Sequence, residues 1–406
     1  MRVLMIAPTS FFSDYGGHIR IFEEIRILQK LGHQICVVTY PLGGNPEGID
    51  VRRAKKLPYH TNYEVGSSRH KFAFDVLLTF KALTTALAYH PHIIHAHMHE
   101  GTLIGSALSR LLRVPLVFDF QGSLTAEMID HHFLDPRGKF HRPLGVLEKW
   151  IDHQPARILT SSQNAVRGLI DQFGVAADKI VPIPDCVDTE RWHPLPPDGT
   201  QLREYLGIPR TRQVVVYLGL LADYQGTRVL IEAAEKLTRR GADVHFLIMG
   251  FPGVNVYADY ARKLGVAHRV SFPGKIPYEQ AQQWLALGDV AVAPKMSLTE
   301  GNGKILNYMA MGLPVVAFEH PVAREYLGNL GVYVPLGDAN GLADALESTL
   351  NDRARASELG RALRARVIEK FSWDAMGREI EQVYMALVPS PGTTVKIEPK
   401  FEHLQK

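Results

Sequence analysis

The fold of this chain is decided by residues 299–317, which read TEGNGKILNYMAMGLPVVA. A glycine-rich turn leads into a helical pattern, and the apolar run that begins at Val315 predicts a buried strand. A helix that starts at such a turn would offer unpaired backbone N–H groups and the positive end of its dipole to an anion. Glu300, inside the turn, could accept hydrogen bonds from hydroxyl groups. The stretch therefore predicts a site for a sugar carried on a diphosphate.

Strand-like and helical patterns alternate along the chain in two sets. The apolar runs of the first set are Val3–Ala7, Gln34–Thr39, Ile93–Ala96, Leu116–Phe120 and Arg157–Thr160. Those of the second set are Val214–Leu218, His245–Met249, Val270–Phe272, Val290–Ala293 and Val315–Phe318. A Pro-rich passage, 182–197, separates the two sets. Strands that alternate with helices favour parallel, doubly wound sheets, so we predict two α/β domains that face each other across a cleft.

The order of three motifs resembles that of retaining, nucleotide-sugar-dependent glycosyltransferases of the GT-B fold, carbohydrate-active family 4. Gly16-Gly17 match that family's paired glycines after the first strand. The strand and turn at 216–226 are similar to the opening of its second domain. Residues 300–303 match the first glutamate and the glycines of its donor signature, and Asn307 stands where the family has a second glutamate.

The resemblance implies two doubly wound Rossmann-like domains and a C-terminal helix that crosses back to the first domain. We expect an acceptor-side domain at 1–190, a donor domain at 191–372, the crossover helix at 373–388 and a polar tail at 389–406. It also implies the transfer of a hexose or related sugar, with retention, from a UDP- or GDP-sugar to a hydroxyl of a sugar, a glycolipid or a small molecule.

The same resemblance supplies the candidate site residues. The catalytic candidates are Glu300, Lys304, Gln121 and His97. The donor-binding candidates lie in the first turn, at strand ends of the second domain and in the donor stretch: Gly16, Gly17, Arg20, Gly219, Gly250, Lys275, Ile276, Lys295, Gly301, Asn302, Gly303, Ile305 and Asn307.

Two cations that are typical of the family are absent from the sequence. Leu220 stands where the family has an arginine and Gln225 where it has a lysine, and both cations usually neutralise the donor diphosphate. Lys304 and Lys295 are the candidates to replace them. Gln121 stands where relatives often carry a histidine; a glutamine can bind sugar hydroxyls but cannot move protons near neutral pH.

Three histidines raise the question of a metal. His95, His97 and His99 alternate at a predicted strand end, so their side chains would share a face, as zinc ligands do. No second cysteine or carboxylate cluster of ligand spacing accompanies them in the sequence, and there is no Asp-x-Asp element. We therefore predict a metal-independent enzyme without a resident metal or cofactor, in which these histidines have structural or acceptor-side roles.

Composition narrows the class of protein and its surroundings. The 406 residues carry a formal charge of only +3, so nothing demands a nucleic-acid partner. Cys36 and Cys186 predict free thiols, which fits a cytoplasmic protein. No run reaches the roughly 18 apolar residues of a membrane span. The basic run 52–56 fits a solvated face or, alternatively, a peripheral contact with an anionic membrane at its inner face.

Two other functions stay open at this level. The missing cations at Leu220 and Gln225, together with Asn307, would fit a non-catalytic sugar-nucleotide-binding or partner-activating subunit. A nucleotide-sugar epimerase is a further alternative, although it leaves the order of the motifs unexplained. A nicotinamide dehydrogenase is disfavoured because the first turn lacks the Gly-x-Gly-x-x-Gly pattern.

Overall fold

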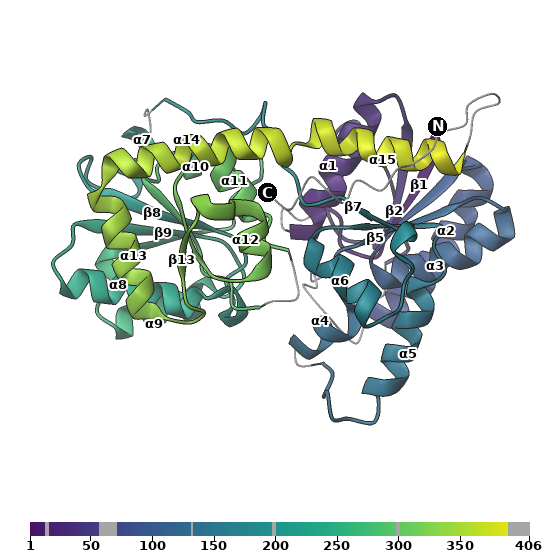
Figure 1. The fold of residues 1–406 in the computed structure, drawn as a ribbon, viewed down its shortest axis with the longest axis horizontal. Coiled ribbons are helices and arrows are strands. Elements are labelled where there is room, and N and C mark those ends of the chain that lie inside the picture. Colours follow the sequence, from purple (N-terminus) through teal and green to yellow (C-terminus); the bar gives the residue numbers. More distant parts are fainter. Residues whose placement is uncertain (13–15, 57–70, 131–132, 197–199, 298–300, 389–406) are drawn as a thin grey trace.

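The computed structural model describes residues 1–12, 16–56, 71–130, 133–196, 200–297 and 301–388, which form two lobes (Figure 1). The first lobe holds a seven-stranded parallel sheet with the order β3-β2-β1-β4-β5-β6-β7. Its strands are β1 (Arg2–Ala7), β2 (Gln34–Thr39), β3 (Asp50–Arg53), β4 (Ile93–His97), β5 (Leu116–Phe120), β6 (Arg157–Thr160) and β7 (Ile180–Pro182). Its helices are α1 (Gly16–Lys30), α2 (Lys71–Tyr89), α3 (Met98–Leu112), α4 (Leu124–Asp130), α5 (His141–Asp152) and α6 (Gln163–Asp171).

The second lobe repeats this plan with a six-stranded parallel sheet of order β10-β9-β8-β11-β12-β13. Its strands are β8 (Gln213–Leu218), β9 (Val244–Met249), β10 (Val270–Gly274), β11 (Val290–Ala293), β12 (Val315–Phe318) and β13 (Val332–Val334). Its helices are α7 (Thr200–Tyr205), α8 (Thr227–Arg239), α9 (Val254–Lys263), α10 (Ala281–Leu285), α11 (Lys304–Ala310), α12 (Pro321–Leu327), α13 (Ala339–Asn351) and α14 (Arg353–Lys370). The prediction of two doubly wound α/β units is confirmed.

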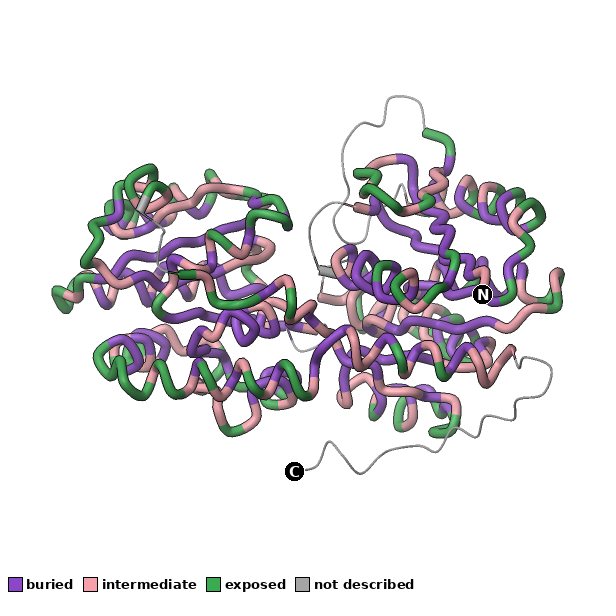
Figure 2. Tube along the Cα trace, turned by 90° about the horizontal axis from the view of Figure 1, so that it is seen from above, coloured by how far each residue is buried: buried purple, intermediate pink, exposed green. Residues whose placement is uncertain are grey.

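Each sheet is covered by helices on both faces, which explains why its central strands are almost wholly apolar. In β1 the residues alternate between two cores: Val3 and Met5 pack with α1, while Leu4 and Ile6 pack with α2 and α3. Figure 2 shows buried backbone running through the inside of both lobes, with the exposed residues on the outer helices.

Three strands escaped the sequence analysis because they lack an apolar run. β3 reads DVRR, β7 ends in Pro182, and β13 has only three residues. These three strands, β3, β7 and β13, lie at sheet edges, where short strands, charges and proline are tolerated.

The last helix, α15 (Trp373–Leu387), crosses from the second lobe to the first, as expected (Figure 1). It packs on α1, where a Cβ on Gly377 would lie 2.3 Å from Ile27, so glycine allows the close approach. Lys30 pairs with Asp374 at 2.8 Å. The first lobe is thus completed by residues that follow the second lobe in the sequence.

One helix is more apolar than the sequence analysis noted. Among the described residues, α2 is long and apolar enough, by length and composition only, to cross a membrane. The sequence analysis missed it because Lys71, Asp75 and Lys81 interrupt the apolar run. One side of α2, including Phe74 and Leu78, packs into the first lobe, so α2 is a domain helix whose outer side is also apolar.

Candidate functional site

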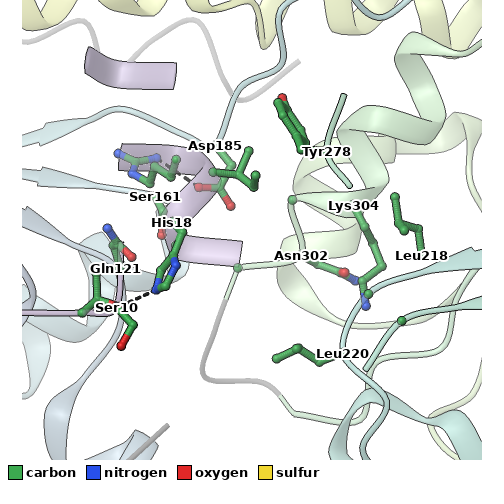
Figure 3. Close-up of a pocket in the computed structure, with 18 of the residues that line it drawn as sticks. Ser10, His18, Gln121, Ser161, Asp185, Leu218, Leu220, Tyr278, Asn302 and Lys304 are labelled. Carbon is green, nitrogen blue, oxygen red and sulfur yellow. Dashed lines mark hydrogen bonds and ion pairs between the residues drawn. The ribbon is translucent and has the colours of Figure 1, made fainter. Parts of the chain in front are cut away.

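A cavity of ≈ 390 Å³ lies between the lobes, where the carboxyl ends of strands from both sheets meet. Figure 3 shows first-lobe side chains on one side of it and second-lobe side chains on the other. Loops that follow six strands form part of the cavity wall. One lining residue from each loop is Ser10, Gln121, Gly219, Gly250, Lys275 and Gly303. The cavity can therefore hold a ligand that touches both lobes.

On the second-lobe side, two glycines bring the backbone itself to the cavity wall. Gly219 follows β8 and Gly250 follows β9. A Cβ on Gly250 would lie 1.8 Å from the Gly219 carbonyl oxygen, and a Cβ on Gly219 would lie 2.9 Å from Lys304 Nζ. Both positions require glycine, and both line the cavity as predicted.

Lys304, the first residue of α11, supplies a positive charge to this wall (Figure 3). Its Nζ donates to Gln225 Oε1 at 2.7 Å and to the Tyr217 hydroxyl at 3.3 Å. It also lies 4.6 Å from the centroid of the Tyr217 ring. The charge of Lys304 thus sits beside Gln225, the position at which the resembling family carries a lysine.

Asn302 is a buried amide in the same loop. Its side chain lines the cavity, and neither Oδ1 nor Nδ2 has a hydrogen-bond partner among the residues that the structure describes. A buried amide without partners is costly, so a ligand that fills the cavity would gain by satisfying it. Asn302 is a strong candidate for a ligand contact.

The start of α11 offers fewer free N–H groups than expected. The Ile305 N–H donates to the Asn302 carbonyl oxygen and the Leu306 N–H donates to that of Gly303, both at 3.0 Å. Ile305 is fully buried and does not line the cavity. The sequence analysis placed Ile305 among the donor-binding residues, but the structure places its side chain in the hydrophobic core.

On the first-lobe side, Gly17 and Gln121 lie against each other. A Cβ on Gly17 would lie 2.6 Å from Gln121 Oε1. Gln121 Nε2 donates to Asp119 Oδ2 at 2.8 Å, and the His97 Nδ1–H donates to the same carboxylate at 3.1 Å. Both Gly17 and Gln121 line the cavity, but His97 is fully buried behind it. His97 therefore supports the Asp119–Gln121 pair from below, which corrects its expected contact with substrate.

Arg20 joins several carboxylates at the base of the cavity. It donates to Asp119 at 2.8 Å and to Asp185 at 3.0 Å, and it lies 3.1 Å from Glu24. Burial alone would raise the pKa of Asp119, but the Arg20 guanidinium and the His97 ring hold it well below its usual range. Arg20 lines the cavity, yet its charge is balanced by these partners, so it positions the site rather than neutralising a donor diphosphate.

Asp185 links the two lobes, a role that sequence reasoning missed. Its Oδ1 accepts from Arg20 of the first lobe and its Oδ2 accepts from the Tyr326 hydroxyl of the second, at 3.2 Å. A Cβ on Gly301 would lie 2.6 Å from Oδ2, so the segment that leads into α11 also packs against this carboxylate. The position of Asp185 in the Pro-rich passage 182–197, between the two sets of strands, was the available signal.

His18 was also missed, although it directly follows Gly17. It lines the cavity (Figure 3), and its Nε2 hydrogen-bonds Thr9 Oγ1. Burial lowers the pKa of His18 to about 3, and the nearby cations Lys275 and Lys71 add to the effect. The ring is therefore neutral near pH 7.

The remaining predicted residues divide into two groups. Those that line the cavity are Lys275, Ile276, Gly301, Gly303 and Asn307. Gly16 is the first residue of α1. Lys295 is buried and is not part of the cavity lining; its Nζ donates to the Gly301 carbonyl oxygen at 2.7 Å. Lys295 thus stabilises the segment that leads into α11. Glu300 lies outside the described residues.

Two buried groups could each hold a metal ion: Glu24 with His95 and His97, and His99 with Glu148 and Asp152. The sequence analysis found no such sets because their carboxylates come from other helices. Arg20 lies beside Glu24, which opposes a cation at the first group, and His99 pairs with Asp152 at 3.2 Å in the second. None of these six residues lines the cavity.

Two family models match the chain in adjoining parts. Residues 16–191 match "Glycosyltransferase Family 4" and residues 212–352 match "Glycosyl transferases group 1". The chain is 29% identical to the D-inositol 3-phosphate glycosyltransferase of Corynebacterium aurimucosum, over 95% of this chain and 96% of that protein. It is 25% identical to the phosphatidyl-myo-inositol mannosyltransferase of Mycobacterium leprae, over 98% and 100%.

A solved structure shows the same arrangement of lobes. HepE of Anabaena in complex with UDP-glucose superposes with a TM-score of 0.76 at 18% identity, covering 95% of this chain and 100% of that one. Two parallel sheets around a cleft with a crossover helix therefore define the GT-B fold. Within that class, the chain belongs to the glycosyl transferases of group 1 and family 4.

Proposed function

We propose that the chain transfers a sugar, with retention of anomeric configuration, from a UDP- or GDP-sugar to a hydroxyl acceptor. The observation that carries this proposal is the cavity in which Lys304 and Asn302 of the second lobe face Gln121 and His18 of the first (Figure 3). One ligand on each wall would bring a donor and an acceptor together, which is how proximity lowers a barrier to transfer.

The second lobe is proposed to hold the nucleotide diphosphate. Gly219 and Gly250 let the donor approach the backbone, and Lys304 places a full charge where the leaving diphosphate gains negative charge. The buried side-chain amide of Asn302 would form hydrogen bonds with the donor. In this scheme the leaving oxygen takes the proton of the incoming hydroxyl on the same face, so no strong protein base is needed.

The first lobe is proposed to orient the transferred sugar and the acceptor. The Gln121 amide, held by Asp119, can donate to or accept from sugar hydroxyls but carries no transferable proton. Glu300 stays a prediction for hydroxyl binding on the sugar. Because the named relatives act on inositol derivatives, we infer an acceptor with a polyol or sugar hydroxyl.

We further propose that transfer needs no divalent metal and that the chain works in the cytoplasm, in peripheral contact with a membrane. Among the residues that line the cavity the carboxylates are Glu127 and Asp185, and Asp185 is already engaged by Arg20 and Tyr326. The described lining thus offers no carboxylate pair for a metal-bound diphosphate.

A non-catalytic binding subunit is the second candidate, favoured by Leu220, Gln225 and Asn307 at positions where the family carries charges. The test is a panel of UDP- and GDP-sugars with the purified chain, in which affinity is read by thermal shift and turnover by release of the nucleoside diphosphate. We expect one donor to bind and to turn over, with a product of the donor's anomeric configuration by NMR. Affinity without turnover on any acceptor offered would favour the binding subunit.

A further inference from the structure

The exposed apolar side chains gather on one part of the first lobe. Fifteen large hydrophobic residues of the described chain are exposed, and eleven of them lie between positions 72 and 150. These eleven are Phe72, Val76, Phe80, Leu87, Leu103, Leu111, Phe133, Phe140, Val146, Leu147 and Trp150. Single exposed hydrophobics are ordinary, but a contiguous group marks a contact surface.

Three helices carry most of this group and lie side by side. α2 packs on α3, and α3 packs on α5. On α2, Phe72, Val76 and Phe80 recur every four residues and so share one side of the helix. The opposite side of α2 packs into the core of the lobe. We call the outer side of α2, α3 and α5, with its exposed hydrophobic residues, the apolar face.

The charges around the apolar face are mainly positive. On α5, Arg142 and Lys149 are exposed, whereas Glu148 and Asp152 are buried and turned toward His99. Glu148 also accepts backbone N–H groups from the start of α4. The outer side of α5 therefore presents cations and apolar groups together.

Two of these cations lie over rings of the apolar face. Lys139 Nζ lies 5.2 Å from the centroid of the Phe140 ring, and the Arg110 guanidinium lies 5.8 Å from that of Trp150. Aromatic rings flanked by lysine and arginine are the composition that suits the headgroup region of an anionic bilayer.

The apolar face also adjoins the cavity. Lys71 and Phe74 at the start of α2, and Met98 at the start of α3, line the cavity wall. The first turns of α2 and α3, two helices of the apolar face, thus form part of the cavity wall. A molecule anchored in a surface under the apolar face could present its headgroup to the cavity.

We propose that the apolar face docks on a bilayer that contains anionic lipids, and that the acceptor is a lipid whose hydroxyl-bearing headgroup enters the cavity beside Lys71 and Phe74. The second part rests on the proposed function. Within the basic run 52–56, the two arginines are engaged by the protein itself: Arg53 donates to the carbonyl oxygens of Tyr40 and Leu42, and Arg52 pairs with Asp50.

The test uses the full chain with vesicles of phosphatidylcholine alone or with added phosphatidylglycerol. Phe72→Asp/Phe80→Asp and, separately, Val146→Asp alter the apolar face without touching the cavity. The matched control is Val256→Asp/Ile368→Asp, which changes two exposed hydrophobic residues of the second lobe. We expect the parent and the control to sediment with anionic vesicles, and the α2 double variant to bind about tenfold more weakly or worse.

The outcomes separate the docking surface from the proposed function. If donor binding fails but the α2 variant still loses vesicle binding, the surface stands and the enzymatic proposal falls. The surface is overturned if the parent ignores anionic vesicles, if the control loses binding equally, or if the parent is a dimer in solution that the α2 variant makes monomeric. For the acceptor, vesicle-borne glycolipid or inositol lipid should be glycosylated faster by the parent than by the α2 variant, with equal rates on a soluble acceptor. Equal rates on both acceptors would overturn the lipid assignment.

Discussion

Among single residues, Lys304 has the clearest consequence because its ammonium lies 2.7 Å from the Gln225 amide oxygen. Lys304→Met should lower transfer roughly ten- to a hundredfold, as expected for loss of a charged hydrogen bond to the leaving group. Gln225→Lys in the same chain should restore part of the rate, because the new ammonium would reach the same point of the wall. The measurement is the steady-state release of nucleoside diphosphate.

The control for this pair is Lys263→Met, an exposed lysine on α9 that is remote from the cavity lining. It should leave both the rate and the donor affinity unchanged. Parent-level turnover in Lys304→Met would show that the charge is supplied elsewhere, and the idea of compensation would then be abandoned.

Replacement of Asn302 should have opposite effects on the stability of the free protein and on its affinity for the donor. Because both polar atoms of its buried amide lack partners in the described structure, Asn302→Ala should leave the ligand-free melting temperature unchanged or higher. The same change should weaken donor binding roughly tenfold, since the donor loses hydrogen bonds. Thermal shift with and without donor measures both effects, and the exposed Asn340→Ala serves as control. A lower ligand-free melting temperature with intact donor affinity would identify a purely structural amide.

At the level of elements, the contact between α12 and α6 depends on a carboxyl group. Glu325 Oε2 accepts the N–H of Gln163 at 3.0 Å, and burial raises the pKa of Glu325 from 4.5 to about 7. Between these two pH values the folded chain keeps a proton that the unfolded chain has lost. The free energy of unfolding from this group therefore falls as the pH rises from about 4.5 to about 7.

Glu325→Gln should remove that fall, since the amide oxygen can still accept the Gln163 N–H. We expect the variant to be more stable than the parent at pH 8, on the order of 1–3 kcal/mol, and to differ little from it near pH 4.5. Melting temperatures at pH 5 and pH 8 provide the measurement, with the exposed Glu319→Gln as control. A difference that does not change with pH would rule out titration of Glu325 as the cause.

The sequence predicted the inner strands of each sheet well and the edge strands poorly. β2, β5, β6, β11 and β12 begin and end where the predicted runs do, because a strand covered by helices on both faces is mostly apolar. β3 and β7 carry arginines or a proline at a sheet edge, so no apolar run marks them.

The sequence predicted some parts of the candidate site and not others. Gly219, Gly250 and Gln121 follow strands, so the rule for doubly wound sheets and the family resemblance found them. The hydrogen bonds of Arg20 could not be predicted, because its partners Asp119 and Asp185 lie 99 and 165 positions away in the sequence. His97 and Lys295 were assigned to the cavity because a position in the sequence does not reveal whether a side chain lies in a wall or behind it.

For the whole molecule, the absence of a carboxylate pair in the described cavity lining predicts that transfer continues in excess EDTA. The chain should be dialysed against chelator and assayed with and without added Mg²⁺ or Mn²⁺. Complete loss of activity that either ion restores would count against the proposed mode of donor binding. Loss of stability without loss of the initial rate would instead point to the buried groups around Glu24 or His99.

The route of α15 has a consequence for how the protein is made. A ribosome releases β1 to β7 first, but α15, which begins at Trp373, emerges only after the entire second lobe. Until then, the packing contact between Ile27 and Gly377 cannot form. The hydrogen bond between the His95 ring and the Tyr384 hydroxyl, which lies 2.6 Å from Nδ1 in the complete fold, is also missing. The first lobe is thus synthesised first but completed last, and we expect its contact surface for α15 to stay exposed until translation ends.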